Sequence, residues 1–157
     1  MIVLESGFYP YVLISFRGKD FSEAEFTAHL DASAAVGRKA QEAGTRHAVI
    51  TLGGADMRAS KRKMVAELME DFPKELMDLP VGSYVVVNSA VVRGIVTVLR
   101  WLSPRLSRIE AVESIDDAMV AASAAFRANG IVVEAATTSS ARRWLEDELA
   151  LREQLTA

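Results

Sequence analysis

Short runs of consecutive apolar residues alternate along the chain with longer segments in which apolar residues recur every three or four positions. Such runs are typical of strands buried on both faces, and the longer segments of amphipathic helices. The clearest example is residues 82–102, where the apolar run 84–87 is followed by Asn88 and Ser89 and then by apolar positions at mostly helical spacing. This pattern predicts a buried strand that passes through a tight polar junction into an apolar helix.

The N-terminal segment predicts a β-hairpin and a helix. Apolar runs at 1–4 and 11–16 flank a turn marked by Gly7 and Pro10, which favours a hairpin. Ser22 and Glu25 have the spacing of a capping box, so a helix is expected to begin there. Gly44 is placed to end that helix in the left-handed conformation.

The rest of the chain repeats the alternation, with strands or helices expected at residues 47–52, 59–70, 108–112, 115–127 and, as a short strand, 131–133. Pro73 is expected either to start a new turn or to break a helix. Ser139 and Ser140 are expected to cap a last amphipathic helix over residues 141–155, which its sequence ties least to the core. The acidic residues 146–148 are expected on the surface of this helix.

The predicted order is β-β-α-β-α-β-α-β-α, which indicates an α/β fold. Strands that alternate with helices imply a mainly parallel sheet with right-handed crossovers, and the hairpin makes the sheet mixed. We expect one α/β domain over residues 1–135. Residues 136–157 form an amphipathic helix that is either docked on this domain or used in an interface.

Composition narrows the class of protein. The chain has 157 residues, half of them apolar and a quarter charged, as in one globular domain. Its net charge of −3 provides no basic field for nucleic acid. The absence of cysteine excludes disulfides, thiolate catalysis and cysteine-ligated metals. No apolar stretch is long enough for a membrane span, and the first residues lack a secretory signal, so a cytoplasmic protein is expected.

Two loops are candidate sites for chemistry. The first follows the strand at 47–52, where Gly54 and Arg58 precede Ser60 at the start of a helix. Backbone N–H groups there are suited to a phosphate, and a basic cluster continues to Lys63, but no phosphate-binding motif surrounds the glycines. The alternative is a plain turn, with Ser60 as a helix-start residue. His29 and His47 are the only imidazoles, and nothing in the sequence brings either one to Ser60.

The second loop is the junction after the strand at 84–87. The carboxyl ends of parallel strands form the usual ligand edge of an open α/β sheet, and Asn88 and Ser89 lie there. Arg93 follows Ser89 by one helical turn, so both side chains are candidates for binding an anion. The alternative is that Asn88 or Ser89 caps the helix and Arg93 pairs with a nearby carboxylate. No metal-binding pattern is present, and no cofactor is expected.

The layout resembles the STAS fold of anti-sigma-factor antagonists, in its SpoIIAA-like branch of small bacterial proteins. The resemblance rests on the segment 88–94, on the pair Trp101-Leu102 at the end of the following helix, and on the helix start 114–118. It covers about residues 1–130. It implies protein binding rather than catalysis. Antagonists of this family carry a phosphorylatable serine, and Ser60 is the nearest position, although its neighbours differ from the family motif.

Two functions follow as expectations. The first is a non-enzymatic regulatory module that binds other proteins and associates with itself, with Trp144, Leu145 and Leu149 of the last helix as the interface. The alternative is binding of a small anion or lipid by residues of the two loops. The CRAL-TRIO lipid-transfer family has a related mixed-sheet fold, and by analogy of fold alone it suggests a lipid pocket.

Overall fold

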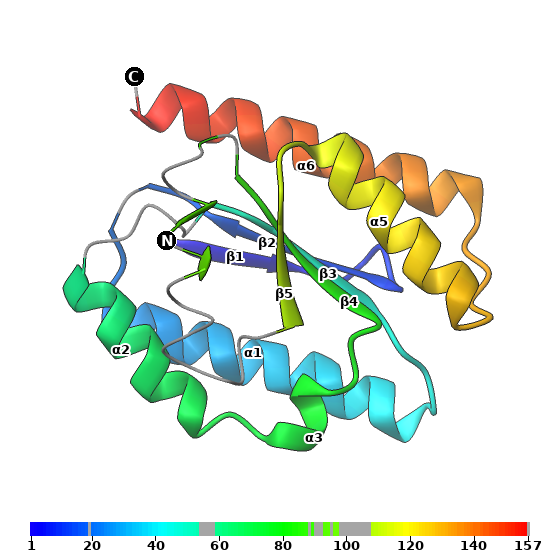
Figure 1. The fold of residues 1–157 in the computed structure, drawn as a ribbon, viewed down its shortest axis with the longest axis horizontal. Coiled ribbons are helices and arrows are strands. Elements are labelled where there is room, and N and C mark those ends of the chain that lie inside the picture. The colour runs from blue at the N-terminus through cyan, green and yellow to red at the C-terminus, as the bar shows by residue number, and fades with distance from the viewer. Residues whose placement is uncertain are drawn as a thin grey trace.

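The computed structural model describes residues 1–18, 20–53, 59–87, 89, 93–94, 96–97 and 108–156. Its centre is a five-stranded sheet in the order β1-β2-β3-β4-β5 (Figure 1). The strands are β1 (Ile2–Glu5), β2 (Tyr11–Phe16), β3 (Ala48–Leu52), β4 (Gly82–Val86) and β5 (Ile109–Val112). β1 and β2 are antiparallel, whereas the other neighbouring strands are parallel. The predicted mixed, mainly parallel α/β sheet is confirmed.

Helices cover both faces of this sheet. α1 (Glu23–Glu42), α2 (Ala59–Glu70) and α3 (Lys74–Met77) lie on one face, and α5 (Ile115–Ala128) and α6 (Ala135–Thr156) on the other (Figure 1). Because β2 to β4 are parallel neighbours in chain order, right-handed connections place α1, α2 and α3 on the same face. After β5, α5 and α6 cover the opposite face.

Local sequence signals set the ends of α1. The Ser22 hydroxyl accepts the N–H of Glu25 at 3.1 Å, and the Glu25 carboxylate accepts the N–H of Ser22 at 2.7 Å. This is the predicted capping box. At the other end Gly44 has φ of 65°, the left-handed conformation expected of a glycine there. Pro73 immediately precedes α3, so of the two alternatives it starts a new turn.

The main core lies between the sheet and the pair α5 and α6. On β3, Ala48, Ile50 and Leu52 are fully buried toward this core, while Val49 and Thr51 alternate with them and remain partly exposed on the other face. The largest buried side chains of this core include Tyr11, Phe126 and Met119. The alternate residues of this central strand therefore show that one face of the sheet is completely buried and the other only partly.

Two expectations near the C-terminus are wrong. Residues 131–133 form no strand, and Val132 is 95% exposed. Gly130, with φ of 67°, follows the end of α5, and in the connection to α6 the side chains of Ile131 and Val133 pack against the main core instead of joining the sheet. α6 begins at Ala135 rather than after the predicted caps Ser139 and Ser140, which lie exposed within the helix. Its early start brings Thr138 within 3.2 Å of the Tyr11 hydroxyl, a contact between elements distant in sequence.

α6 is also more firmly attached than its sequence indicates. Ala141 and Leu145 are completely buried, and Glu148, expected on the surface, is 6% exposed. The Arg17 guanidinium forms a two-pronged ion pair with Glu148, and Arg152 donates from Nε to the Phe16 carbonyl at 2.9 Å. Glu148 lies on the apolar stripe of the helix because Arg17, at the end of β2, supplies its counter-charge there.

The helix expected after Ser89 lies mainly outside the described residues, as does the pair Trp101-Leu102. Arg93, Gly94, Val96 and Thr97 are helical, and Val96 is buried against Val87. Within the described ranges, no helix has the length and apolar character needed to cross a bilayer.

Candidate functional site

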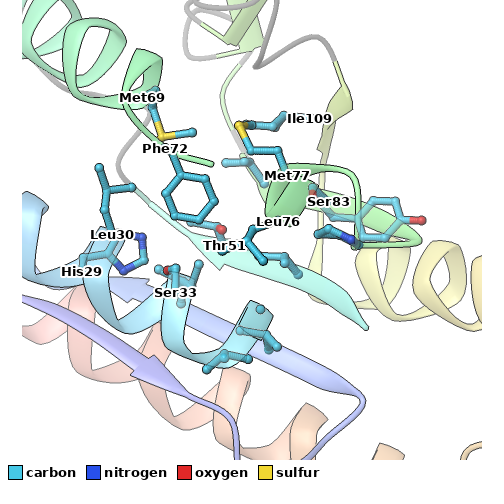
Figure 2. Close-up of a pocket in the computed structure, with 18 of the residues that line it drawn as sticks. His29, Leu30, Ser33, Thr51, Met69, Phe72, Leu76, Met77, Ser83 and Ile109 are labelled. Atoms are coloured by element: carbon cyan, nitrogen blue, oxygen red, sulfur yellow. The ribbon is translucent and has the colours of Figure 1, made fainter. Parts of the chain in front are cut away.

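A cavity of about 240 Å³ lies between the sheet and the helices α1, α2 and α3 (Figure 2). This volume exceeds the ~150 Å³ that holds benzene in an engineered protein core, and approaches the ~300 Å³ of the smaller natural ligand pockets. The cavity is lined mainly by apolar side chains. Its size and lining match those of a site for a small apolar molecule.

The floor of the cavity is built by residues that face one another across parallel strands. Val12 of β2 lies opposite Val49 of β3, which lies opposite Ser83 of β4. A second row runs from Ile14 to Thr51 and on to Val85 in the same way. All six side chains line the cavity. Because successive side chains alternate between faces, these two rows occupy one face of the sheet while the main core fills the other.

The walls come from the three helices and the turn between α2 and α3. Figure 2 shows Leu30 of α1, Met69 of α2, Phe72 of the turn and Leu76 of α3 around the space over Thr51. Phe26 and Val65 belong to the same apolar cluster and are almost completely buried. The wall is therefore assembled from elements distant in the sequence.

Small side chains at facing positions explain why this space is hollow. Ser33 and Gly37 on α1 lie over a floor that contains Thr51 and Ser83. A Cβ added at Gly37 would lie 3.3 Å from Leu76, so α1 and α3 approach closely at this point. The helices are thus held at a fixed distance from the sheet, but the side chains beneath them are too short to fill the gap.

Three polar atoms of the cavity wall are buried without a hydrogen-bond partner among the described residues. They are Nδ1 of His29, Oγ of Ser33 and Nδ1 of His47. His29 packs between the rings of Phe16 and Phe26, with ring centroids 5.9 Å and 5.8 Å away. The whole His47 residue is 5% exposed. Buried polar atoms in native proteins are almost always satisfied, so these three indicate a missing partner.

Both histidines are neutral at physiological pH. Burial lowers the pKa of His29 to about 4. Burial, with the positive charge of Arg46 as a smaller cause, likewise lowers the pKa of His47 to about 4. A neutral imidazole carries one N–H donor and one acceptor nitrogen. The polar groups of the cavity therefore present hydrogen-bonding capacity without charge.

No Lys, Arg, Asp or Glu lies among the cavity-lining residues that the structure describes. Nor does any group of histidine and acidic side chains within the described ranges have the arrangement of a metal site. The cavity is thus an apolar space with a few neutral polar groups.

The candidate binding residues that the structure describes do not line the cavity. Gly54, Arg58 and Asn88 fall outside the described residues. Ser60 is exposed in the first turn of α2, and Ser89 is partly exposed. Neither Ser60 nor Ser89 lines the cavity.

Arg93 already has an intramolecular partner. Its guanidinium lies 2.8 Å from the carboxylate of Glu113. Its backbone N–H donates to the backbone carbonyl of Ser89 at 3.0 Å. Lys61 of the basic cluster likewise pairs with Asp20 at 3.3 Å. These cations offer less free charge to an anion than the sequence suggests.

The candidate interface residues contribute to the chain's own core. Leu145 is completely buried, and Trp144 and Leu149 are partly buried against the same core cluster. Their apolar surface is therefore largely used within the chain.

Sequence reasoning missed His29, Ser33 and His47. The ring of His29 faces the cavity and packs between two phenylalanines. A signal was present: Phe26, His29, Leu30, Ser33 and Gly37 follow helical spacing on one face of α1. Polar and small residues on an apolar stripe, opposite Thr51 and Ser83, mark a face that is not completely filled.

Comparison with known proteins gives no assignment, since no protein-family model, curated protein or solved structure matches the chain.

Proposed function

We propose that this protein binds a small apolar ligand in the cavity between the sheet and α1–α3. The observation that carries the proposal is an apolar space of about 240 Å³ whose wall contains three buried polar atoms without a partner among the described residues. A ligand with an apolar body and a polar group would fill the volume and satisfy such atoms.

Energetic reasoning also favours an occupant. Binding of an apolar body removes the apolar lining of the cavity from water, which contributes about 25 cal/mol per Å² of apolar surface buried. A polar group of the ligand that bonds the buried polar atoms also relieves the cost of about 1–3 kcal/mol that each atom carries while it is unsatisfied.

Fluorescence titration with the uncharged apolar probe N-phenylnaphthylamine tests this function. The wild-type protein is expected to bind the probe with enhanced emission. Ser33→Leu replaces the hydroxyl by a branched group of three carbon atoms and so adds two heavy atoms to the cavity wall. Binding should weaken at least about tenfold, because the larger side chain occupies the ligand's space. Ser139→Leu makes the same change on the exposed surface of α6 and serves as the matched control.

Absence of probe binding to the wild-type protein would contradict the proposal. Equal affinity of the wild-type protein and of a correctly folded Ser33→Leu variant would do so too, because binding would then lie outside the cavity. Circular dichroism spectra of both variants establish whether the fold is retained.

The finer expectations from the sequence stand as a second proposal: a STAS-like module of the cytoplasm that acts without catalysis and associates with itself. The N-terminal hairpin beside parallel strands supports it. So does the edge position of β1, because an edge strand presents unpaired backbone groups suited to a second chain. Light scattering is expected to give a mass above that of one 17.1 kDa chain. A single-chain mass at every concentration would contradict self-association.

A further inference from the structure

Among the described residues that line the cavity, all the polar side chains are uncharged at neutral pH. They are His29, Ser33, His47, Thr51, Ser83 and Tyr84. We infer that the ligand carries an uncharged hydrogen-bonding group, of the hydroxyl class, on an otherwise apolar body, and that His29 and Ser33 bind this group. The inference rests on the proposed function and names the chemical class of its ligand.

A charged ligand is disfavoured by the surroundings. An ionised carboxylate or ammonium loses its hydration on burial and needs a counter-charge, which the described lining lacks. Two described cations, Arg93 and Lys61, are already paired with the carboxylates of Glu113 and Asp20. An alcohol makes no such demand, because a hydroxyl needs only hydrogen-bond partners.

His29 and Ser33 are arranged to bind one small group together. They lie one helical turn apart on α1, so their side chains share a face (Figure 2). A neutral imidazole and a serine hydroxyl can each donate or accept, and a ligand hydroxyl can do both at once. The rings of Phe16 and Phe26 flank the imidazole and restrict its position.

His47 is an independent indication that the cavity has a polar occupant. It lies immediately before β3, away from α1 in the sequence, and its residue is 95% buried with Nδ1 unpaired among the described residues. If this position had only a structural role, an apolar residue would fill it and leave no buried polar atom unsatisfied. A buried imidazole nitrogen without a partner among the described residues is thus found both on α1 and next to β3.

Competition against N-phenylnaphthylamine with octane, octanol and octanoate tests the inference near neutral pH. These probes share a chain and differ in the terminal group. Octanol is expected to bind about tenfold more tightly than octane, as one well-placed hydrogen bond allows. Octanoate should bind at least about tenfold more weakly than octanol, because its carboxylate is ionised. Ser33→Ala should reduce the preference for octanol over octane about fivefold and leave the affinity for octane unchanged, while Ser139→Ala, on the surface of α6, changes neither.

The outcomes separate this inference from the proposed function. Equal binding of octane and octanol, or octanoate binding as tightly as octanol, would overturn the neutral hydroxyl class while leaving an apolar site in place. An unchanged preference in Ser33→Ala would overturn the role of Ser33. Failure of octanol to displace bound N-phenylnaphthylamine would also overturn the inference, whereas failure of the probe itself to bind would overturn the proposed function.

Discussion

His29 and Ser33 lie one helical turn apart on α1, and each lines the same cavity with a buried polar atom that has no partner among the described residues. The burial of such atoms is unfavourable in the free protein. A site that binds a polar group accepts this cost, whereas a structural core would place apolar side chains here. The stability of variants at these positions therefore reports on function.

His29→Phe is expected to stabilise the free protein by about 1 kcal/mol, because it removes an unsatisfied buried nitrogen and extends the aromatic contacts with Phe16 and Phe26. Urea unfolding monitored by circular dichroism measures the difference. The same variant should lose the preference for octanol over octane. If His29→Phe instead lowers the free energy of unfolding by more than about 1 kcal/mol, the imidazole has a stabilising partner in the free protein.

Stability is expected to fall as the solution is acidified through the window between about pH 6.5 and pH 4. Burial lowers the pKa of His29 and of His47 to about 4 in the folded chain, so between these values the unfolded chain binds more protons. Each histidine then contributes up to about 3 kcal/mol to the decrease. Urea unfolding at several pH values across the window measures this dependence.

His29→Phe supplies the control for the pH dependence. It should show a decrease smaller than that of the wild-type protein by roughly half, because His47 is then the one histidine that remains. The same pH dependence in variant and wild type would contradict the account of His29. The carboxylate of Glu148 contributes at lower pH, since its hydrogen bond with Arg17 holds its pKa below the ordinary value.

Arg17→Met is expected to destabilise the chain by about 3 kcal/mol, because it removes the hydrogen-bonded counter-charge of the buried Glu148 carboxylate and leaves only the weaker influence of Arg152. Adding Glu148→Met should restore most of the loss, since the double variant has no buried charge at this position. Arg142→Met is the matched control on α6: its ion pair with Asp116 is exposed, so the change should be below about 1 kcal/mol. If Arg17→Met and Arg142→Met lower the free energy of unfolding by similar amounts, the buried Arg17–Glu148 pair does not stabilise the chain more than an exposed pair does.

The sequence predicts the framework of the fold well because its signals there are local. The capping box at Ser22 and Glu25, the left-handed Gly44 and the apolar run of β3 all act within a few residues. The start of α6 was predicted wrongly because it depends on contacts with distant elements, including that between Thr138 and Tyr11. The Arg17–Glu148 pair joins positions 131 apart and leaves no local pattern.

The cavity is likewise a property of several elements at once. Ser33, Thr51 and Ser83 are unremarkable as single residues, and only the strand register and the placement of α1 bring them around one space. Charged and glycine-rich loops carry known motifs, so the candidate residues that the sequence offers lie in such loops. A neutral apolar site has no motif of that kind, so its residues were identified from the structure.

Methyl NMR of methionine-labelled protein during titration with octanol tests the central claim most directly. Met69 and Met77 line the cavity, whereas Met119 is buried in the core on the opposite face of the sheet and serves as the internal control. We predict saturable shifts of the Met69 and Met77 methyl signals, with nuclear Overhauser contacts to the octanol chain, and an unchanged Met119 signal. Saturable binding that leaves Met69 and Met77 unshifted, or no binding at all, would contradict a ligand site in this cavity.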